Sequence, residues 1–354
     1  MLMDKLSSKE RMDKFYKGEV IDRVPFISSA TMYAGRMVGL SCEEFYFDVK
    51  KSYNAQKLVC EMHQCDGGPC YDLPHGEVLD FGGELAFPKT TKVELPLVKR
   101  YPVNNLNEAI DYKIPQSSRW ISLHKKIEFL KYMHEQELWG GVSISAGSPF
   151  TMVGSIVNTN LLFRWLIKEP EIVHKLLKQA VEYLLQSADI LIQEFGIERC
   201  SVSSNYPFES NELISSKTFE TFSMPYILEV HKRLREKGLK SFGIHLCGNQ
   251  NKNLHYYKEL NLPDRSFISS DERNDLVNVA KILGNQYIYA GNIPSGLLVE
   301  GKPIEVYRCS ESVIKSMKYN EGGFVLMPSC DLPINTSPIN LYAMLKACRD
   351  FGQY

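Results

Sequence analysis

The hydrophobic pattern from about residue 139 onward alternates between two kinds of segment. Short apolar runs of β type are each followed by a longer stretch that has the spacing of an amphipathic helix. Strands that alternate with helices of ten or more residues are typical of βαβ units and of a parallel sheet. The apolar runs are GGVSISAG (140–147), RCSVSS (199–204), SFGIHLCG (241–248), RSFISS (265–270), YIYAGNI (287–293) and GGFVLMPSC (322–330), and the helical stretches are 155–195, 217–237, 250–260, 275–283, 303–319 and 338–350.

The N-terminal part of the chain has a different pattern. An entry helix leads into the short apolar run VPFISS (24–29), which predicts a further strand, and the stretch from about 31 to 115 shows no sustained period. We expect a helical or irregular cap region there. Six βα units and at least one more strand favour a (β/α)8 TIM barrel, formed as a single domain over residues 1–354. No Gly-x-Gly-x-x-Gly follows any strand, which argues against an open dinucleotide-binding sheet.

Composition narrows the class of partner. The chain has 354 residues, 44% of them hydrophobic, and a formal charge of -1, so neither nucleic acid nor an anionic membrane is an expected partner. The charged start of the chain lacks the apolar core of a signal peptide, and no apolar run approaches about 18 residues. We therefore expect a cytoplasmic protein with nine mostly reduced cysteines. The oligomeric state stays open, a homodimer included.

The candidate chemistry lies where predicted strands end, because active sites of barrels form at the carboxyl ends of the strands. His245 and Cys247 end one strand with their side chains on the same face, and Cys330 ends another strand on the same rim. Three nitrogen and sulfur ligands with an open fourth position are the composition of a catalytic zinc site. Asp271 or Glu272, at the tail of the strand between them, is a candidate oxygen ligand.

Two alternatives to this metal site remain at this point. Cysteine is often a small buried hydrophobe, so His245 and Cys247 are also compatible with plain packing. A second group of soft ligands lies in CEMHQCDGGPC, with Cys60, Cys65 and Cys70 around a histidine. Its spacing matches neither the usual zinc hook nor the common iron–sulfur runs, which disfavours it.

Further candidates follow from their place at strand ends or in the cap. Carboxylates and a histidine in the cap are suited to acid–base work, and aromatic rings are suited to an apolar substrate. A solvated loop, turn chemistry and core filling are the competing explanations. The catalytic candidates are Asp72, Glu77 and Asn205, and the substrate-binding candidates are Tyr33, Tyr71, His75, Ser203, Tyr206 and Asn292.

Several motifs spread over the whole chain resemble the uroporphyrinogen decarboxylase superfamily, and within it the zinc-dependent corrinoid methyltransferases. SSKERMDKFYKGEVIDRVPF is similar to the opening helix and "DRVP" turn of the family. SAGSPFTMVGSI and LISSKTFETFSMPY are similar to its central loop and helix motifs. HLCGN, AGNIPSGLLVEGKPIEV and the tail GGFVLMPSCDLPINTSPINLYAM resemble its ligand strand and C-terminal segments. In the tail, Ile339 stands where the family usually has Glu.

The resemblance implies a branch and a reaction. The decarboxylases bind a substrate rich in carboxylates through an arginine set, of which only Arg36 is present here, although Asp72 stands where they carry their essential aspartate. The methyltransferase branch uses the residues that match His245, Cys247 and Cys330 as zinc ligands. The implied activity moves a methyl group between a small substrate and the cobalt of a corrinoid carried by a partner protein. A methoxylated aromatic donor is favoured over a thiol acceptor such as coenzyme M. A metal-free decarboxylase and a non-catalytic corrinoid-binding module are the alternatives.

Overall fold

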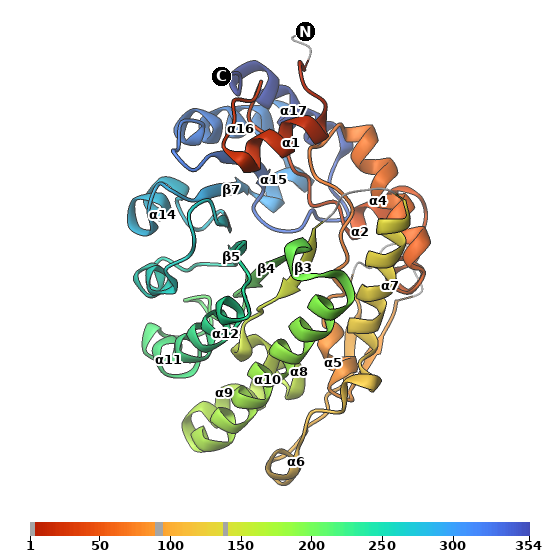
Figure 1. The fold of residues 1–354 in the computed structure, drawn as a ribbon, viewed down its shortest axis with the longest axis vertical. Coiled ribbons are helices and arrows are strands. Elements are labelled where there is room, and N and C mark those ends of the chain that lie inside the picture. Colours follow the sequence, from red (N-terminus) through yellow and green to blue (C-terminus); the bar gives the residue numbers. More distant parts are fainter. Residues whose placement is uncertain (1–3, 89–94, 137–140) are drawn as a thin grey trace.

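A six-stranded parallel sheet forms the centre of the molecule in the computed structural model, which describes residues 4–88, 95–136 and 141–354. Each strand pairs with the next along the chain, so the strand order follows the sequence, and the helices lie around the strands (Figure 1). This confirms the predicted βα alternation and the TIM-barrel class of fold. The strands are β3 (Val142–Ser145), β4 (Cys200–Asn205), β5 (Phe242–Leu246), β6 (Phe267–Ser270), β7 (Ile288–Ile293) and β8 (Phe324–Pro328).

The predicted N-terminal strand forms an extended segment beside β8 rather than a full ladder. Phe26 makes a single parallel bridge with Leu326, flanked by hydrogen bonds from the Ile27 N–H to the Leu326 carbonyl and from the Leu326 N–H to the Pro25 carbonyl. Pro25 has no N–H to add to a ladder, which explains why the pairing stays short. On its other side, the Phe26 carbonyl accepts a hydrogen bond from the Asp66 N–H at 2.6 Å.

Alternation along the strands separates two faces. In β3, β4 and β5 every second residue is buried, as in Val142 and Ile144 of β3, and this set packs towards the surrounding helices, with α10 (Pro170–Phe195) against β3. The other face carries small or polar side chains that are less buried, such as Ser203 and His245. The carboxyl ends of these strands therefore present polar groups to the interior of the barrel.

Most helices occur where the pattern predicts them, with breaks that have local causes. The expected helix 155–195 is interrupted at Asn158, whose side chain caps the next helix, and at Pro170, which starts the third. The expected helix 217–237 is interrupted at Ser223, before a proline. The helices after β3 are α8 (Pro149–Ile156), α9 (Thr159–Lys168), α10, α11 (Ser216–Phe222), α12 (Met224–Glu236), α13 (Leu254–Tyr257), α14 (Leu276–Leu283), α15 (Ser295–Glu300), α16 (Pro303–Met317) and α17 (Pro338–Phe351).

The cap region contains more regular helix than its sequence pattern indicates. The hydrophobic pattern does not reveal its 15-residue helix α4 (Val49–His63), because two polar residues, Ser52 and Gln56, lie on the buried face of this helix. Residues 89–94 of the cap lie outside the described part of the chain. The elements before β3 are α1 (Ser8–Lys17), α2 (Met32–Met37), α3 (Cys42–Phe47), α4, α5 (Gly76–Asp80), β1 (Glu84–Ala86), β2 (Leu97–Arg100), α6 (Leu106–Asp111) and α7 (Ile121–Glu135). The described helices include none that is long and apolar enough to cross a membrane.

A buried ion-pair network joins the entry helix to the start of the barrel. Arg11 of α1 and Arg23 are both fully buried, and each donates to one oxygen of the buried Asp66 carboxylate, at 2.6 and 2.8 Å. Arg11 also pairs with Asp22, and Arg23 pairs with Asp4. Because Asp22 and Arg23 begin the DRVP motif, this network gives that motif its structural role.

We predict that replacing Asp66 with Asn strongly destabilises the fold. The substitution leaves two buried guanidinium groups without their shared counter-charge, a change that costs about 3–5 kcal/mol in comparable buried pairs. Urea unfolding followed by circular dichroism measures the effect. The matched control is Glu220→Ala, which breaks an exposed pair with Lys217 and should change stability by less than about 0.5 kcal/mol. Equal effects of the two substitutions would contradict this assignment.

Candidate metal centre

Three soft ligands from two strand ends come together in the structure. His245 is the fourth residue of β5, Cys247 follows the end of that strand, and Cys330 lies two residues beyond the end of β8. One ligand atom from each of these side chains lies within 4.8 Å of the other two. They form the one such group of three or more among the described residues. The predicted ligand set thus converges, although Cys247 lies in the turn after the strand, where its N–H donates to the His245 carbonyl.

The imidazole of His245 is oriented for a ligand. Its Nδ1 is 2.9 Å from the Ser269 Oγ of β6, which the parallel register places directly beside His245. Its Nε2 is buried and has no hydrogen-bond partner. A buried polar atom without a hydrogen-bond partner is costly, so its presence needs an explanation. A bound metal provides one, because it would take the free lone pair of Nε2. When Nε2 binds a metal, Nδ1 carries the proton, and this N–H donates a hydrogen bond to Ser269. Such a hydrogen bond fixes the tautomer in metal-bound histidines.

The contact between the two thiols makes their pKa values differ. Their mutual hydrogen bond lowers the pKa of Cys330 to about 4, with a further contribution from His245 and against the effect of burial. The same contact raises the pKa of Cys247. A tetrahedral zinc site with bonds of about 2.0–2.3 Å places its ligand atoms about 3.3–3.8 Å apart. One imidazole nitrogen and two sulfur atoms are a donor set that zinc takes, and here these atoms lie within 4.8 Å of one another.

The other metal candidates do not join this group. The Asp271 carboxylate instead accepts a hydrogen bond from the Arg273 N–H at 2.9 Å, and Glu272 is exposed at the surface. Neither belongs to the group of ligand atoms that lie within reach of one another. The expectation of an oxygen ligand from this strand end is therefore not supported. Within the part of the chain that the structure describes, the cysteines at 60, 65 and 70 also form no such group with His63.

The charged cap residue Asp72 interacts electrostatically with Glu77 and with Asp331, the residue that follows the ligand Cys330. Burial, and then the nearby Asp72, raise the pKa of Glu77 to about 7, so part of this carboxyl stays protonated near neutral pH. Asp331 follows the ligand Cys330, and burial, Asp72 and Cys330 raise its pKa to about 7 as well. Burial lowers the pKa of Lys126 on α7, whereas the negative charges of Asp72 and Glu77 act to raise it. Asp331 is thus the electrostatic link between the cap carboxylates and the ligand group.

The predicted residues at the ends of β4 and α5 lie in open positions. Asn205 and Ser203 are exposed on the inner face of β4, and Asn205 pairs in register with His245. His75 is exposed just before α5, with a left-handed backbone at φ 58°. Asn292 is half-buried, and its amide donates to the carbonyls of Asp271 and Asn274. That amide supports the loop after β6, and its assignment as a substrate-binding group stays a prediction.

Three aromatic rings that are predicted to contact substrate lie in the hydrophobic core. Tyr33 is fully buried, and its hydroxyl is 3.0 Å from the Nε2 of His63. Tyr71 donates to the Tyr46 carbonyl at 2.9 Å and is 8% exposed. Tyr206 is fully buried beside Tyr257, with ring centroids 5.0 Å apart. The local sequence around an aromatic residue does not show whether its ring packs in the core or binds a ligand.

Sequence reasoning missed three residues of this site. Ser269 could have been found, because strand parity places it on the same face as His245. Asp331 directly follows a predicted ligand in PSCDLP, which is a usable signal for a charged neighbour. Lys126 comes from a cap helix whose position over the barrel depends on tertiary packing, and nothing in its local sequence marks it.

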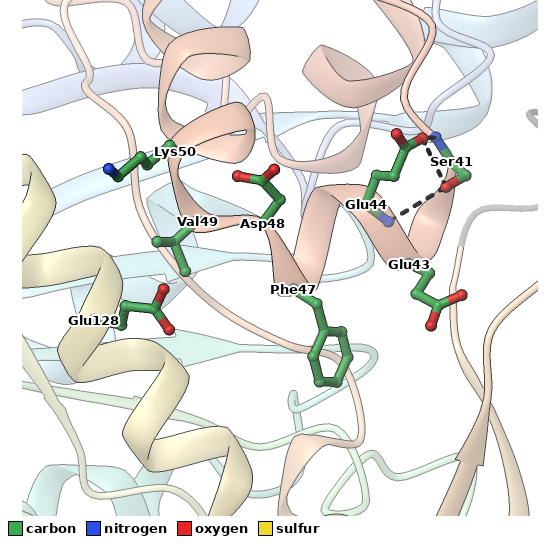
Figure 2. A pocket seen from close by; sticks show the side chains of 8 residues that line it. All are labelled: Ser41, Glu43, Glu44, Phe47, Asp48, Val49, Lys50 and Glu128. Atoms are coloured by element: carbon green, nitrogen blue, oxygen red, sulfur yellow. Dashed lines mark hydrogen bonds between the residues drawn. The ribbon is translucent and has the colours of Figure 1, made fainter.

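Two hollows of about 410 and 680 Å³ lie away from the metal candidates. Figure 2 shows the smaller one, between α3, the start of α4 and α7, where it is lined mainly by charged side chains such as Glu43, Asp48 and Glu128. The larger one lies along α10 and includes His174 and Lys178. None of the predicted site residues lines either hollow, so these hollows do not define the candidate site.

The barrel and the ligands at its rim define an α/β-barrel protein with a candidate metal centre of one histidine and two cysteines. A profile of the family "Uroporphyrinogen decarboxylase (URO-D)" matches residues 7–351, and the chain belongs to this family. This confirms the resemblance seen in the sequence motifs.

Two proteins of Methanosarcina mazei are similar to this chain. A curated relative, a methylated-thiol–coenzyme M methyltransferase, is 26% identical over 207 residues, which are 57% of this chain and 51% of the relative. The match therefore spans about half the length of that relative. A solved structure described as a methyltransferase superposes with a TM-score of 0.77 at 19% identity, covering 98% of this chain and 99% of its own. This second match supports the fold.

In the segment after β4, the carboxyl group of Glu209 is fully buried among hydroxyl groups. It accepts hydrogen bonds from Ser148, from Thr151 at 3.2 Å and from Ser223 at 2.7 Å. Burial raises its pKa to about 7, while these hydrogen bonds act in the opposite direction. The folded state therefore binds a proton more tightly than the unfolded state at this position.

We predict that Glu209 makes the fold less stable as the pH rises. A raised folded-state pKa means that the folded protein holds more protons than the unfolded one between about pH 4.5 and 7, so stability falls across that range. Relative to wild type, Glu209→Gln should gain on the order of 2–3 kcal/mol between pH 5 and pH 8. Urea titrations at both pH values measure this difference. The exposed Glu182→Gln is the control, and a Glu209→Gln difference that does not change with pH would contradict the assignment.

Proposed function

We propose that this protein is a zinc-dependent methyltransferase that moves a methyl group between a small substrate and the cobalt of a corrinoid carried by a partner protein. The observation that carries the proposal is the convergence of His245, Cys247 and Cys330, with the His245 Nε2 buried and unpartnered. Membership of the URO-D family and the similarity to methyltransferases support it.

The residues of the site have separate tasks in this proposal. His245, Cys247 and Cys330 would hold zinc, which supplies a Lewis acid for an ether oxygen or for a thiol sulfur. When Nε2 of His245 binds the metal, Ser269 accepts a hydrogen bond from the Nδ1–H group and keeps the imidazole directed at the site. Asn205, beside His245 on the inner face of the barrel, offers an amide to a bound substrate.

The Glu77 carboxyl is the candidate proton donor. Its pKa of about 7 leaves it partly protonated near neutral pH, which suits a group that protonates a departing phenolate oxygen. Asp72, which contributes to that raised pKa, keeps the proton on Glu77 by like-charge repulsion. We assign His75 and Ser203, both exposed, to substrate contact rather than to proton transfer.

Charge favours one of the two substrate classes. Asp72 raises the pKa of both Glu77 and Asp331, Asp331 follows the ligand Cys330, and the positive charge of Lys126 acts against the shift of Glu77. An excess of carboxyl groups disfavours an anionic substrate, because like charges repel in a partly desolvated site. We therefore favour a neutral methoxylated aromatic as methyl donor over an anionic thiol acceptor such as coenzyme M.

Decarboxylation of a polycarboxylate is less consistent with the structure. Arg36, the one member of the decarboxylase arginine set in this chain, donates to the Ile334 carbonyl and to the Asn335 side chain. Its guanidinium is thus already engaged by the chain itself. A substrate with many carboxylates would instead need several free cations around the site.

We predict that purified wild-type protein contains about one zinc per chain and that His245→Ala and Cys330→Ala contain almost none, because each removes one of three ligands. Elemental analysis measures this, with Cys309→Ala of α16 as the cysteine control that retains the metal. Demethylation of methoxylated aromatics by wild type, followed by the absorbance change of cob(I)alamin, should fall by at least about 100-fold in both ligand variants. Wild-type protein that stays free of zinc after incubation with the metal would contradict the proposal.

A further inference from the structure

A fully buried glutamine lies directly behind the ligand Cys247. The Nε2 of Gln250 donates to the carbonyl of Cys247 at 2.8 Å and to that of Tyr206 at 2.9 Å. Its Oε1 accepts hydrogen bonds from Asn253 at 3.0 Å and from the Tyr257 hydroxyl at 3.1 Å. All four hydrogen-bonding positions of this side-chain amide are therefore used.

A buried asparagine holds the same loop from the other side. The Oδ1 of Asn274 accepts the backbone N–H of Gln250 at 2.8 Å, and its Nδ2 donates to the Gly248 carbonyl at 2.8 Å. Asn274 is fully buried, and its own carbonyl accepts from Asn292 at 2.9 Å. The loop that follows His245 is thus tied to the strand ends of both β4 and β6.

The turn between these two amides leaves the loop little freedom. Gly248 has a left-handed backbone at φ 66°, and a Cβ there would lie 2.8 Å from the Ser210 Oγ. The backbone immediately after Cys247 is therefore held by a glycine-specific turn and by hydrogen bonds to its carbonyls. Both buried amides act on the backbone of the loop, through the carbonyls of Cys247 and Gly248.

We propose that Gln250 and Asn274 are positioning residues that set the direction of the Cys247 thiolate towards the metal. This inference rests on the zinc site of the proposed function. A metal–ligand bond is sensitive to a few tenths of an ångström in the ligand backbone, and residues behind the ligands commonly alter metal affinity 10- to 100-fold. Because the Gln250 amide clamps the Cys247 carbonyl to that of Tyr206, it acts through the backbone of the ligand.

The test uses substitutions that keep the shape of the buried side chain. Gln250→Met preserves length without donors, and Asn251→Ala is the matched control, because this exposed residue of the same loop bonds to Asn249 and to the Arg273 carbonyl. Zinc affinity is measured by competition with a chromophoric chelator. The visible spectrum of the cobalt(II)-substituted protein reports ligand geometry, and thermal melting reports folding.

We expect Gln250→Met to fold, to bind zinc about 10- to 100-fold more weakly and to shift the cobalt(II) bands, while Asn251→Ala matches wild type. If Gln250→Met fails to fold, Tyr257→Phe decides, because it removes one bond that orients the Gln250 amide and should weaken zinc binding about threefold or more. A folded variant with wild-type affinity and spectrum would overturn the positioning role while leaving the proposed function intact. Wild-type protein that binds no zinc would overturn both.

Discussion

The parallel register of the barrel strands is the constraint on which the site depends. Because β5 and β8 run in the same direction, their carboxyl ends meet on one rim. The ligand atoms of His245, Cys247 and Cys330 therefore lie within 4.8 Å of one another, although the two cysteines are 83 residues apart in the sequence. The same register sets Ser269 and Asn205 on either side of His245. One geometric rule thus supplies the ligands, the residue that orients the imidazole and a polar neighbour on the inner face.

Around these ligands, buried amides keep the metal loop rigid where apolar packing alone would leave it free. Gln250 and Asn274 satisfy backbone carbonyls that the turn at Gly248 leaves without strand partners. A buried polar network of this kind is favourable only when every member is paired, which makes it specific for one arrangement of the loop. The Nε2 of His245 is one of the buried polar atoms that this arrangement leaves unpaired, and a metal would satisfy it.

How far the sequence predicts this structure depends on whether the signal is local. Strand parity and the βα alternation identify all six strands of the sheet, and they place His245, Cys247 and Cys330 on a common rim. The helix α4 of the cap is not predicted from the sequence, because the polar residues Ser52 and Gln56 on its buried face interrupt the hydrophobic period of the helix. Tyr33, Tyr71 and Tyr206 were predicted to bind substrate, but their rings are buried, and only tertiary packing reveals that difference. Lys126 and the amide clamp at Gln250 likewise depend on contacts between distant segments.

Zinc K-edge X-ray absorption of the wild-type protein tests the central claim most directly, because it counts the ligand atoms of the metal. We predict a first shell with two sulfur atoms at about 2.3 Å and one imidazole nitrogen at about 2.0–2.1 Å, completed by a light exchangeable ligand. A first shell of oxygen and nitrogen alone would contradict the assignment of Cys247 and Cys330 as ligands and, with it, the proposed chemistry.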